Sequence, residues 1–419
     1  MSKEKKNIPE LRFPEFEGDG EWVEKTLGEL LEFKNGINAS KGQYGKGIKF
    51  INVLDILKEE HITYDNIIGK VDVDNSILQK NAVIYGDLLF QRSSETQEEV
   101  GTANVYLDKE KTATFGGFVI RGKKIGDYDP IFLNALLKTS EIRRSISSKA
   151  GGSTRFNVGQ ETLSSTIILL PSLTEQQKIA ACLSSLDRLI AAHRDKLEAL
   201  NDHKKGMMQN LFPLEGEKAP KYQFPEFAGD GEWEEKTLGK IATFSKGKGI
   251  SKSDIVEDGK LPCIRYGELY THYKETISEI QSYTNLNPDD LVLSEANDVI
   301  IPASGETQID IATASCVTKK GVALGGDLNI IKANVNGVFL SYYLNNSKKM
   351  EIARMAQGIS VVHLYANQLK TLILNLPKPE EQQKIAACLS SLDASIAAQA
   401  EKIEQLQQHK KGLMQGLFP

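Results

Sequence analysis

Cysteine and histidine are scarce in this sequence of 419 residues, which has only four cysteines and six histidines. The cysteines form no CxxC pair and no cluster with histidine at metal-ligand spacing, which argues against a disulfide scaffold and predicts no metal site in this chain. No apolar run approaches the roughly 18 residues that a membrane span needs. The start, MSKEKKNIPELRF, lacks the apolar region of a secretion signal. We therefore expect a cytoplasmic protein with no membrane partner.

Catalytic motifs are missing as well. The sequence has no GxxxxGK[ST] phosphate loop, no HExxH motif and no GxSxG motif, and the glycine-rich segment at 245–253 has the wrong spacing for a phosphate loop. The NPDD segment at 287–290 lacks the aromatic residue that a base-methylating motif of the NPPY type stacks on a flipped base. These absences predict a protein without its own catalytic site.

Charge is nearly balanced, with 51 basic and 56 acidic residues and a net charge of −5. A strongly basic domain would indicate nucleic-acid binding, so bulk charge alone favours an enzyme. The distribution along the chain changes this interpretation. Eight basic and only three acidic residues lie between Arg121 and Arg155, and a local excess of this size can neutralise DNA phosphates.

The sequence contains an internal duplication. Residues 12–30 return at 223–241 with 14 of 19 positions identical, and residues 175–213 return at 381–419 with 28 of 39 identical. Between these blocks the two halves diverge. A fixed module that alternates with a variable domain suggests common docking and separate recognition.

Two short islands survive in the divergent parts. GDLLFQRSSETQ at 86–97 corresponds to NDVIIPASGETQ at 297–308, and FGG at 115–117 corresponds to LGG at 324–326. Because SETQ and GETQ recur between divergent flanks, we expect them to shape a turn that is common to both domains.

The second repeated block predicts a long helix in each half. Apolar residues recur at steps of four and three for more than four heptads, which is typical of a coiled coil. At 1.5 Å per residue each helix would reach about 55 Å, and the economical arrangement pairs the two within the chain. The alternative is two separate helices, each packed on its own domain. The predicted helix-pairing residues are Leu183, Leu186, Ile190, Leu197, Leu389, Leu392, Ile396 and Ile403.

Thr174 and Gln177 predict a capping box at the start of the first long helix. Short apolar runs broken by Gly, Asn and Asp predict strands in the divergent segments, together with one helix near Asp129 to Lys149 and another near Val338 to Gln357. The predicted strands lie at 47–56, 82–92, 115–124 and 165–171 in the first half, and at 261–269, 298–304, 325–333 and 372–377 in the second.

The predicted fold class is therefore α+β. Two sheet-centred α/β domains are separated by two long helices, which pair as an intramolecular antiparallel coiled coil with an internal pseudo-two-fold repeat. The expected boundaries are 1–173 for the first recognition domain, 174–213 for the central helix, 214–379 for the second recognition domain and 380–419 for the last helix.

Two loops carry the groups that usually bind DNA. KAGGSTRFNVGQ at 149–160 and AQGISVVHLYANQ at 356–368 combine flexible backbone with side chains that hydrogen-bond phosphates and base edges. The alternative interpretation is a solvated connection. The candidate DNA-binding residues are Arg92, Ser93, Ser94, Arg121, Lys123, Lys124, Lys149, Ser153, Thr154, Arg155 and Asn157 in the first half, and Arg265, Ser304, Lys319, Lys320, His363 and Tyr365 in the second.

The layout resembles the specificity subunit of bacterial type I restriction-modification enzymes. The resemblance rests on two divergent domains that alternate with near-identical helices, on the FPEF…GEW…TLG segment, on the GDLLFQR motif at Gly86–Arg92, and on the prolines that precede EQQKI at Pro171 and Pro377. In the second half Ile301-Pro302-Ala303 replaces the Phe-x-Arg part of the motif, so an Arg role cannot be carried over there.

This resemblance implies a non-catalytic subunit that reads double-stranded DNA. Each domain would read one half of a bipartite site through the major groove, and the helices would fix the spacer. Two modification subunits, which bind S-adenosylmethionine and methylate adenine, would dock on the chain together with ATP-dependent restriction subunits. S-adenosylmethionine, ATP and magnesium would belong to these partners. The alternatives are a stand-alone DNA-modifying or DNA-cleaving enzyme with an unrecognised active site, and a coiled-coil scaffold with no DNA role.

Overall fold

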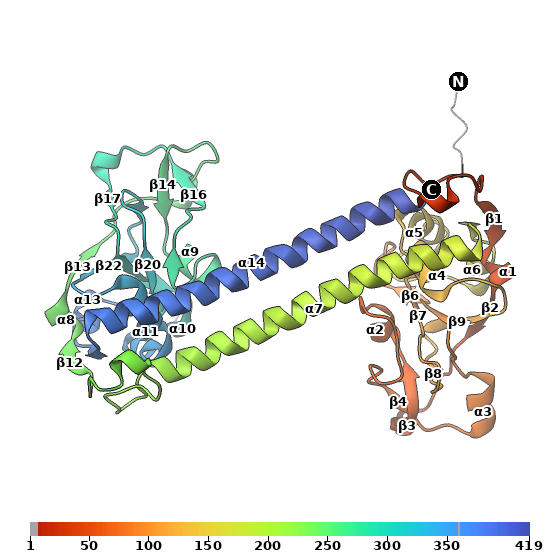
Figure 1. Ribbon diagram of the computed structural model, residues 1–419, viewed down its shortest axis with the longest axis horizontal. Coiled ribbons are helices and arrows are strands. Elements are labelled where there is room, and N and C mark those ends of the chain that lie inside the picture. Colours follow the sequence, from red (N-terminus) through yellow and green to blue (C-terminus); the bar gives the residue numbers. More distant parts are fainter. Residues whose placement is uncertain (1–6, 359–360) are drawn as a thin grey trace. The chain divides into compact units, whose positions relative to one another are not determined.

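The computed structural model describes residues 7–358 and 361–419, which form two compact units (Figure 1). Unit 1 combines the chain up to residue 193 with residues 402–419, and unit 2 comprises residues 194–401. Each unit therefore contains one sheet-based domain, part of the first long helix and part of the second.

The first domain is built on a four-stranded sheet in the order β2-β9-β5-β7, in which all neighbours are antiparallel. A smaller sheet, β4-β3-β8, and the pairs β1-β11 and β10-β6 complete it. The strands are β1 (Val23–Thr26), β2 (Leu31–Asn35), β3 (Tyr44–Ile51), β4 (Lys70–Val71), β5 (Leu88–Gln91), β6 (Ser93–Ser94), β7 (Ala103–Val105), β8 (Thr114–Phe115), β9 (Val119–Lys124), β10 (Phe156–Asn157) and β11 (Ile167–Leu170). The helices are α1 (Leu27–Leu30), α2 (Val53–Ile56), α3 (Asn75–Lys80), α4 (Pro130–Leu137), α5 (Ser140–Ser147), α6 (Gln160–Ser164) and the long α7 (Leu173–Leu211).

The second domain repeats this plan with a five-stranded sheet, β13-β22-β18-β20-β15, and a four-stranded sheet, β16-β14-β21-β17. Its strands are β12 (Glu234–Thr237), β13 (Ala242–Lys246), β14 (Leu261–Ile264), β15 (Thr276–Ile277), β16 (Ser282–Thr284), β17 (Val292–Leu293), β18 (Asp298–Pro302), β19 (Ser304–Gly305), β20 (Ser315–Val317), β21 (Ala323–Leu324), β22 (Leu328–Ala333), β23 (Val362–His363) and β24 (Ile373–Leu376). Its helices are α8 (Leu238–Ile241), α9 (Glu268–Thr271), α10 (Gln308–Ile311), α11 (Gly337–Asn346), α12 (Lys349–Met355), α13 (Ala366–Leu369) and the long α14 (Pro379–Leu417).

Each predicted strand segment contains a strand, but the segments at 47–56 and 261–269 extend into the helices α2 and α9. The segment at 47–56 leaves the strand after Ile51 and continues as α2, because Asn52 caps a new helix by accepting a hydrogen bond from the backbone N–H of Leu54 at 2.9 Å. The single helices expected near 129–149 and 338–357 are also wrong. Each is a pair of helices, α4 with α5 and α11 with α12. In the first pair the break falls at Thr139, whose extended backbone ends one helix and starts the next.

The final residues of α14 belong to the core of the first domain. Phe418 lies 6.2 Å from the ring of Trp22 and 5.4 Å from the ring of Phe132, and all three side chains are buried. Tilted and edge-on contacts of this kind stabilise beyond the apolar area that they bury. The C-terminal Leu-Phe-Pro of the repeated block is therefore an aromatic plug for this domain.

The end of α7 supplies the same plug to the second domain. Phe212 stacks on Tyr343 with ring centroids 5.4 Å apart and lies 5.6 Å from Phe339, while Trp233 contacts both of these rings. The two repeated blocks, one with Gly-Glu-Trp and one with Leu-Phe-Pro, thus meet inside each unit. This contact explains why both blocks are duplicated together.

The long helices contact each other in antiparallel fashion within each unit. In unit 1, Asp187 of α7 forms an ion pair with Lys410 of α14. In unit 2, Lys204 of α7 lies 2.8 Å from Asp393 of α14. Lys204 and Lys410 are equivalent positions of the repeat, as are Asp187 and Asp393, so the same contact forms twice with the helices exchanged. Of the predicted helix-pairing residues, the structure buries Leu183, Ile190, Leu389, Ile396 and Ile403 and half-buries Leu186, Leu197 and Leu392.

The capping prediction for α7 is wrong by two residues. The helix begins at Leu173, and its cap is Ser172, whose hydroxyl accepts a hydrogen bond from the backbone N–H of Glu175 at 3.3 Å. In the second copy α14 begins at Pro379, where a proline fits because the first turn needs no N–H donor.

A buried glutamate fixes the start of each long helix to the segment that precedes its domain. In the first half Arg12 donates two hydrogen bonds to Glu175, from Nε at 2.9 Å and from Nη2 at 2.7 Å. In the second half Gln223 takes the place of Arg12 and donates one bond of 3.3 Å to Glu381. Both glutamates are 1% exposed. Arg12 gives the first a charged partner that donates two parallel hydrogen bonds, whereas Gln223 gives the second a neutral one.

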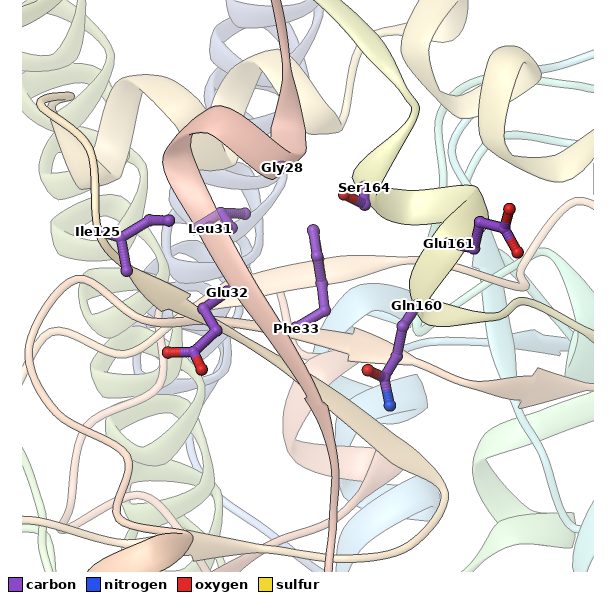
Figure 2. A pocket seen from close by; sticks show the side chains of 8 residues that line it. All are labelled: Gly28, Leu31, Glu32, Phe33, Ile125, Gln160, Glu161 and Ser164. Carbon is purple, nitrogen blue, oxygen red and sulfur yellow. The ribbon is translucent and has the colours of Figure 1, made fainter.

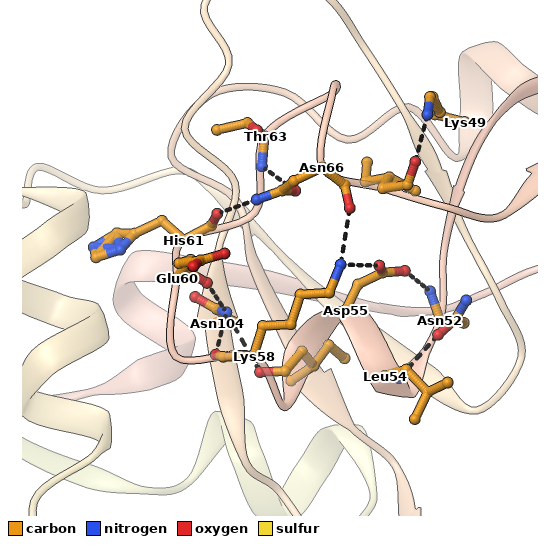
Figure 3. A network of polar contacts seen from close by, with 12 residues as sticks. Lys49, Asn52, Leu54, Asp55, Lys58, Glu60, His61, Thr63, Asn66 and Asn104 are labelled. Atoms are coloured by element: carbon orange, nitrogen blue, oxygen red, sulfur yellow. Dashed lines mark hydrogen bonds and ion pairs between the residues drawn. The ribbon is translucent and has the colours of Figure 1, made fainter. Parts of the chain in front are cut away.

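A polar network around α2 orders the loop that follows this helix (Figure 3). The carboxylate of Asp55 is 2% exposed and accepts hydrogen bonds from the Asn52 backbone at 3.0 Å and from Lys58 at 3.3 Å. Lys58 also donates to the Asn66 carbonyl at 2.8 Å, and Asn104 donates to the Glu60 carbonyl at 2.8 Å. Buried polar groups with several partners each specify one loop conformation.

Candidate DNA-reading site

A short strand pair brings two distant segments together in the first domain. β6 pairs antiparallel with β10, which places Ser93 opposite Asn157 and Ser94 opposite Phe156. The Ser93 hydroxyl also donates a hydrogen bond to the carboxamide oxygen of Asn157. The segment after Arg92 is thereby fixed to the loop that precedes the long helix. The structure thus joins candidates that are more than sixty residues apart in the sequence.

The loop between α5 and β10 is a tight hairpin. Gly151 and Asn157 exchange two backbone hydrogen bonds of 3.0 and 2.8 Å. Gly152 has a φ of +119°, and a Cβ at this position would lie 2.1 Å from the carbonyl oxygen of Arg155. This turn therefore requires glycine at position 152.

The hairpin presents its polar side chains to solvent. The exposed candidates are Lys149, Ser153, Thr154, Arg155 and Asn157. The guanidinium of Arg155 lies 4.0 Å from the carboxylate of Glu95, and both side chains are mostly exposed. Such a pair is weak in water, so Arg155 can exchange Glu95 for a phosphate or a base edge.

Arg92 connects this hairpin to an exposed aromatic residue. Its Nη1 donates to the carbonyl of Gly117 at 3.3 Å, and its backbone N–H donates to the carbonyl of Phe118 at 2.9 Å. The Phe118 side chain is 62% exposed. Proteins that deform DNA often insert an exposed apolar side chain of this kind between bases. Sequence reasoning missed Phe118, although the repeated FGG island immediately before it was a usable signal.

The first part of the GDLLFQR motif is structural. Gly86 has a φ of +90°, which favours glycine, and Asp87 is fully buried. Asp87 accepts hydrogen bonds from the backbone N–H groups of Ile84 at 3.1 Å and Lys124 at 3.0 Å, and burial raises the pKa of its carboxyl. These contacts anchor the start of β5, and Arg92 directly follows the end of this strand at the site.

The second domain builds the same strand pair with different side chains. β19 pairs with β23, so that Ser304 lies opposite His363. These positions correspond in the repeat to Ser93 and Asn157. The ring of His363 lies 6.2 Å from the ring of Tyr365 with an interplanar angle of 22°, and Tyr365 is 50% exposed. The second site thus offers two nearly parallel rings where the first offers an amide.

The second hairpin also requires glycine. Gly358 has a φ of +128°, and a Cβ there would lie 2.1 Å from the carbonyl oxygen of Val361. Gln357 and His363 exchange backbone hydrogen bonds of 2.9 and 2.7 Å. Two residues of the predicted loop, Ile359 and Ser360, lie outside the described residues.

Two predicted DNA contacts in the first domain are used internally instead. Arg121 is only 6% exposed, donates to the carbonyl of Ala82, and lies 5.6 Å from the ring of Phe115. Burial lowers the pKa of Arg121. Lys124 donates to the carbonyl of Tyr128 at 2.8 Å. The burial of β9 explains the outcome for Arg121, because Val119 to Gly122 are buried, while Lys124 at the half-buried end of the strand folds back onto the following turn.

Fewer basic side chains of the stretch from Arg121 to Arg155 are therefore exposed than the sequence predicts. Arg143 donates to the carbonyls of Glu98 and Val100, both at 2.7 Å, and so holds the turn after β6. The exposed basic residues of the stretch are Lys138, Arg144, Lys149 and Arg155, and Lys123 is half-buried.

The remaining candidates of the second domain have acidic partners. Arg265 lies 3.4 Å from Glu268, and it is half-buried. Lys319 and Lys320 follow β20 and lie 3.5 Å from Glu279 and 3.1 Å from Glu295, respectively. Ser94 and Ser304 are buried, so these two side chains shape the strand pairs rather than project from them.

Within the described ranges, no group of three or more His, Cys, Asp or Glu side chains is placed to hold a metal ion. The four cysteines are free thiols. No helix in the described part of the chain is both long and apolar enough to cross a membrane.

The chain thus contains two related sheet-based domains, each with a polar hairpin held by a short strand pair. The family of type I restriction modification DNA specificity domains matches this chain twice, at residues 19–202 and 230–408. The chain therefore belongs to that family, and it is a specificity subunit, the non-catalytic component of a type I restriction-modification system.

Relatives agree with this assignment along the whole chain. The specificity subunit named for type I restriction enzyme MjaX of Methanocaldococcus jannaschii is 26% identical over 410 residues, which cover 94% of this chain and 92% of the relative. The MjaVIII specificity subunit of the same organism is 28% identical over 305 residues and covers 70% and 69% of the two chains.

Solved structures share the fold. A type I restriction-modification S subunit from M. genitalium matches with a TM-score of 0.60 and 16% identity, covering 98% of this chain and 99% of that one. A chain from a structure that describes complex assembly and conformational transition of the type I system matches with a TM-score of 0.53 and 16% identity, covering 94% and 96%. These likenesses agree with the predicted α+β fold with paired long helices.

Proposed function

We propose that each domain reads one half of a bipartite DNA site through the strand pair and hairpin described above. The observation that carries this proposal is the repetition of one backbone arrangement, β6-β10 and β19-β23, with different side chains at equivalent positions. A common backbone with variable side chains is what two readers of different sequences need. The reading residues we propose are Arg155 and Asn157 in the first domain, and His363 and Tyr365 in the second.

The side chains suggest different modes of reading. Asn157 has an exposed amide, which suits paired contacts to an adenine edge when it exchanges its bonds to Ser93 and to the Arg155 carbonyl for the base. Arg155 offers the fork that suits guanine or phosphate. His363 and Tyr365 offer rings as well as polar atoms, and apolar ring edges suit the methyl group of thymine. Arg144 on α5 and Lys149 just after it are exposed near the hairpin, and we propose that they bind phosphates. Phosphate contacts fix the orientation of the domain on the DNA without reading its sequence.

The long helices serve as the spacer in this proposal. Two groove-reading domains on one duplex face need centres separated by about 34 Å or a multiple of that distance, and a continuous helix of 39 residues is stiff enough to impose a separation. Inserting one helical turn near Ala191 should change the spacer of the recognised site and leave both half-sites unchanged.

We further propose that the chain works in the cytoplasm with two modification subunits and with restriction subunits. S-adenosylmethionine, ATP and magnesium would be bound by those partners and not by this chain. Because the chain is slightly acidic, we expect weak DNA binding alone and tight binding with the modification subunit. Equal affinity in both states at one salt concentration would contradict this expectation.

Single substitutions at equivalent positions test the reading assignment. In the complex with modification subunits, Asn157→Ala should relax base preference in one half-site, and His363→Ala should relax it in the other. Each loss should correspond to about 1–3 kcal/mol of discrimination at one base position. Sequencing of methylated DNA from cells that express each variant measures the effect.

The two variants control each other. If Asn157→Ala changes both half-sites, the site does not read one half alone. If neither variant changes any base preference while methylation continues, the hairpins are connections and the reading surface lies elsewhere.

A further inference from the structure

A pocket of about 350 Å³ opens on the first domain, and its lining contains none of the residues assigned to DNA reading (Figure 2). β2 contributes Leu31, Glu32 and Phe33 to its lining, and Gln160, Glu161 and Ser164 come from α6. Gly28 and Ile125 complete it, and Ile125 is 57% exposed. The pocket thus combines an apolar floor with two carboxylates. We call this site, with Glu32 and Glu161 at its lining, the cation pocket.

The second domain shows what fills the equivalent place there. Ser164 of the first half corresponds to Lys370 in the repeat, and both lie against an equivalent glycine, Gly28 and Gly239. The ammonium of Lys370 lies 5.8 Å from the ring centroid of Phe244, which corresponds to Phe33.

The polar partner of this lysine has an equivalent as well. The ammonium of Lys370 also donates to the carboxamide oxygen of Asn367 at 3.4 Å. Asn367 corresponds to Glu161. The second domain therefore covers its aromatic floor with a lysine of its own, whereas in the first domain Ser164 leaves the same floor uncovered and a carboxylate replaces the amide.

We propose that the cation pocket receives a lysine or arginine side chain of the modification subunit. The stem of such a side chain would cover Phe33 and Ile125, and its charge would face Glu161, as the ammonium of Lys370 faces Asn367. A cation over an aromatic face with a carboxylate beside it is a favourable combination. The inference rests on the proposed function, because that function supplies the docked partner.

Charge excludes DNA as the occupant. Glu32 and Glu161 are both exposed, and their carboxylates would repel a phosphate. Lys123, opposite Glu32 in the β2-β9 register, is the basic neighbour across the strands, so Glu161 is the carboxylate that has most charge to offer a partner. The pocket is thus a protein-docking feature of the first domain whose equivalent place in the second domain is covered by Lys370, and the two modification subunits would not dock identically.

The proposed docking of a cation is tested by copying the lysine of the second domain into the first. Ser164→Lys should fill the pocket with an internal lysine in the way that Lys370 fills its equivalent, and that equivalent shows that the change is compatible with the fold. The matched control is Ser165→Lys, which adds the same charge at the exposed neighbouring position outside the pocket. Binding of purified modification subunit to the full chain is measured by titration calorimetry at fixed salt.

We expect Ser164→Lys to weaken one of the two binding steps roughly tenfold, and Glu161→Gln to weaken it about threefold. Ser165→Lys should leave both steps unchanged. If Ser164→Lys binds both modification subunits like the original chain, while its melting temperature shows that it is folded, the inference is wrong. If the original chain binds no modification subunit, the proposed function itself fails, which is a different result.

Discussion

The two halves of this chain build the same junction between domain and helix with different ionic partners. In the first half the buried Glu175 accepts two hydrogen bonds from Arg12, whereas in the second half the equivalent residue, Gln223, is neutral and donates one hydrogen bond to Glu381. Burial raises the pKa of Glu381, because its hydrogen bonds and the charge of Lys378 do not fully offset the loss of water around the carboxylate. The geometry of the junction is thus retained although its electrostatics have diverged.

In the ion pairs between the helices, it is the second half of the chain that has the more extensive charged contact. Lys204 in unit 2 has two carboxylate partners, Asp393 at 2.8 Å and Glu275 at 3.2 Å, and Glu275 belongs to the domain. Lys410 in unit 1 pairs with Asp187. The second domain is therefore tied to the helices through Lys204, and the first through Arg12. The two halves thus keep the same aromatic contact between helix end and domain, but their strongest polar contacts lie at different positions.

The aromatic plugs should carry the largest effect on stability. Phe418→Ala and Phe212→Ala each remove a buried ring from a cluster that includes a tryptophan, and each should lower the free energy of unfolding by about 3–5 kcal/mol. Urea denaturation of both variants measures this. A loss below about 1 kcal/mol in either variant would mean that the helix end does not belong to that domain core.

Exchange of the glutamate partners should have the next largest effect. Arg12→Gln copies the second junction into the first and should cost about 3 kcal/mol, because a buried carboxylate loses its matched cation. Gln223→Arg makes the reverse change and should stabilise the second junction. Urea midpoints of the two variants and of the double variant test the comparison. Equal and small shifts in both directions would show that the junctions are electrostatically equivalent.

The smallest effect concerns pH. Because the pKa of Glu381 is raised in the folded chain, the unfolded chain ionises first as pH increases. Stability from this group is therefore present below the ordinary carboxyl pKa of about 4.3 and is lost as pH rises towards the folded value. Glu381→Gln should remove this loss, so its stability advantage over the original chain should grow between pH 4 and 7. An advantage that shrinks over this range in urea titrations would contradict the assignment.

Periodicity and repetition made much of this fold predictable. The heptad pattern located both long helices, and apolar runs located strands such as β5, β18 and β24. Cap positions and interruptions were harder to predict, because Ser172 acts through its hydroxyl and Thr139 through its extended backbone, and a hydrophobic pattern records neither. The strand pairs β6-β10 and β19-β23 were also hidden, since two-residue strands have no period.

The sequence indicated the two loops of the candidate site, but it did not indicate which residues of the basic stretch are exposed. Arg121 lies in the buried part of β9 and Lys124 at its half-buried end, and both donate to backbone carbonyls, which a charge pattern in the sequence does not show. The cation pocket could not be predicted from Ser164 alone. It becomes visible only when the structure shows Lys370 over Phe244 at the equivalent place.

The central claim is that each domain reads its own half of one DNA site. Its most direct test replaces residues 31–174 with the corresponding domain of another family member and maps methylated sequences in cells that supply the modification subunits. We expect one half-site to change to that of the donor, while the other half-site and the spacer stay as they were. An unchanged site, or a change in both halves, would contradict the claim.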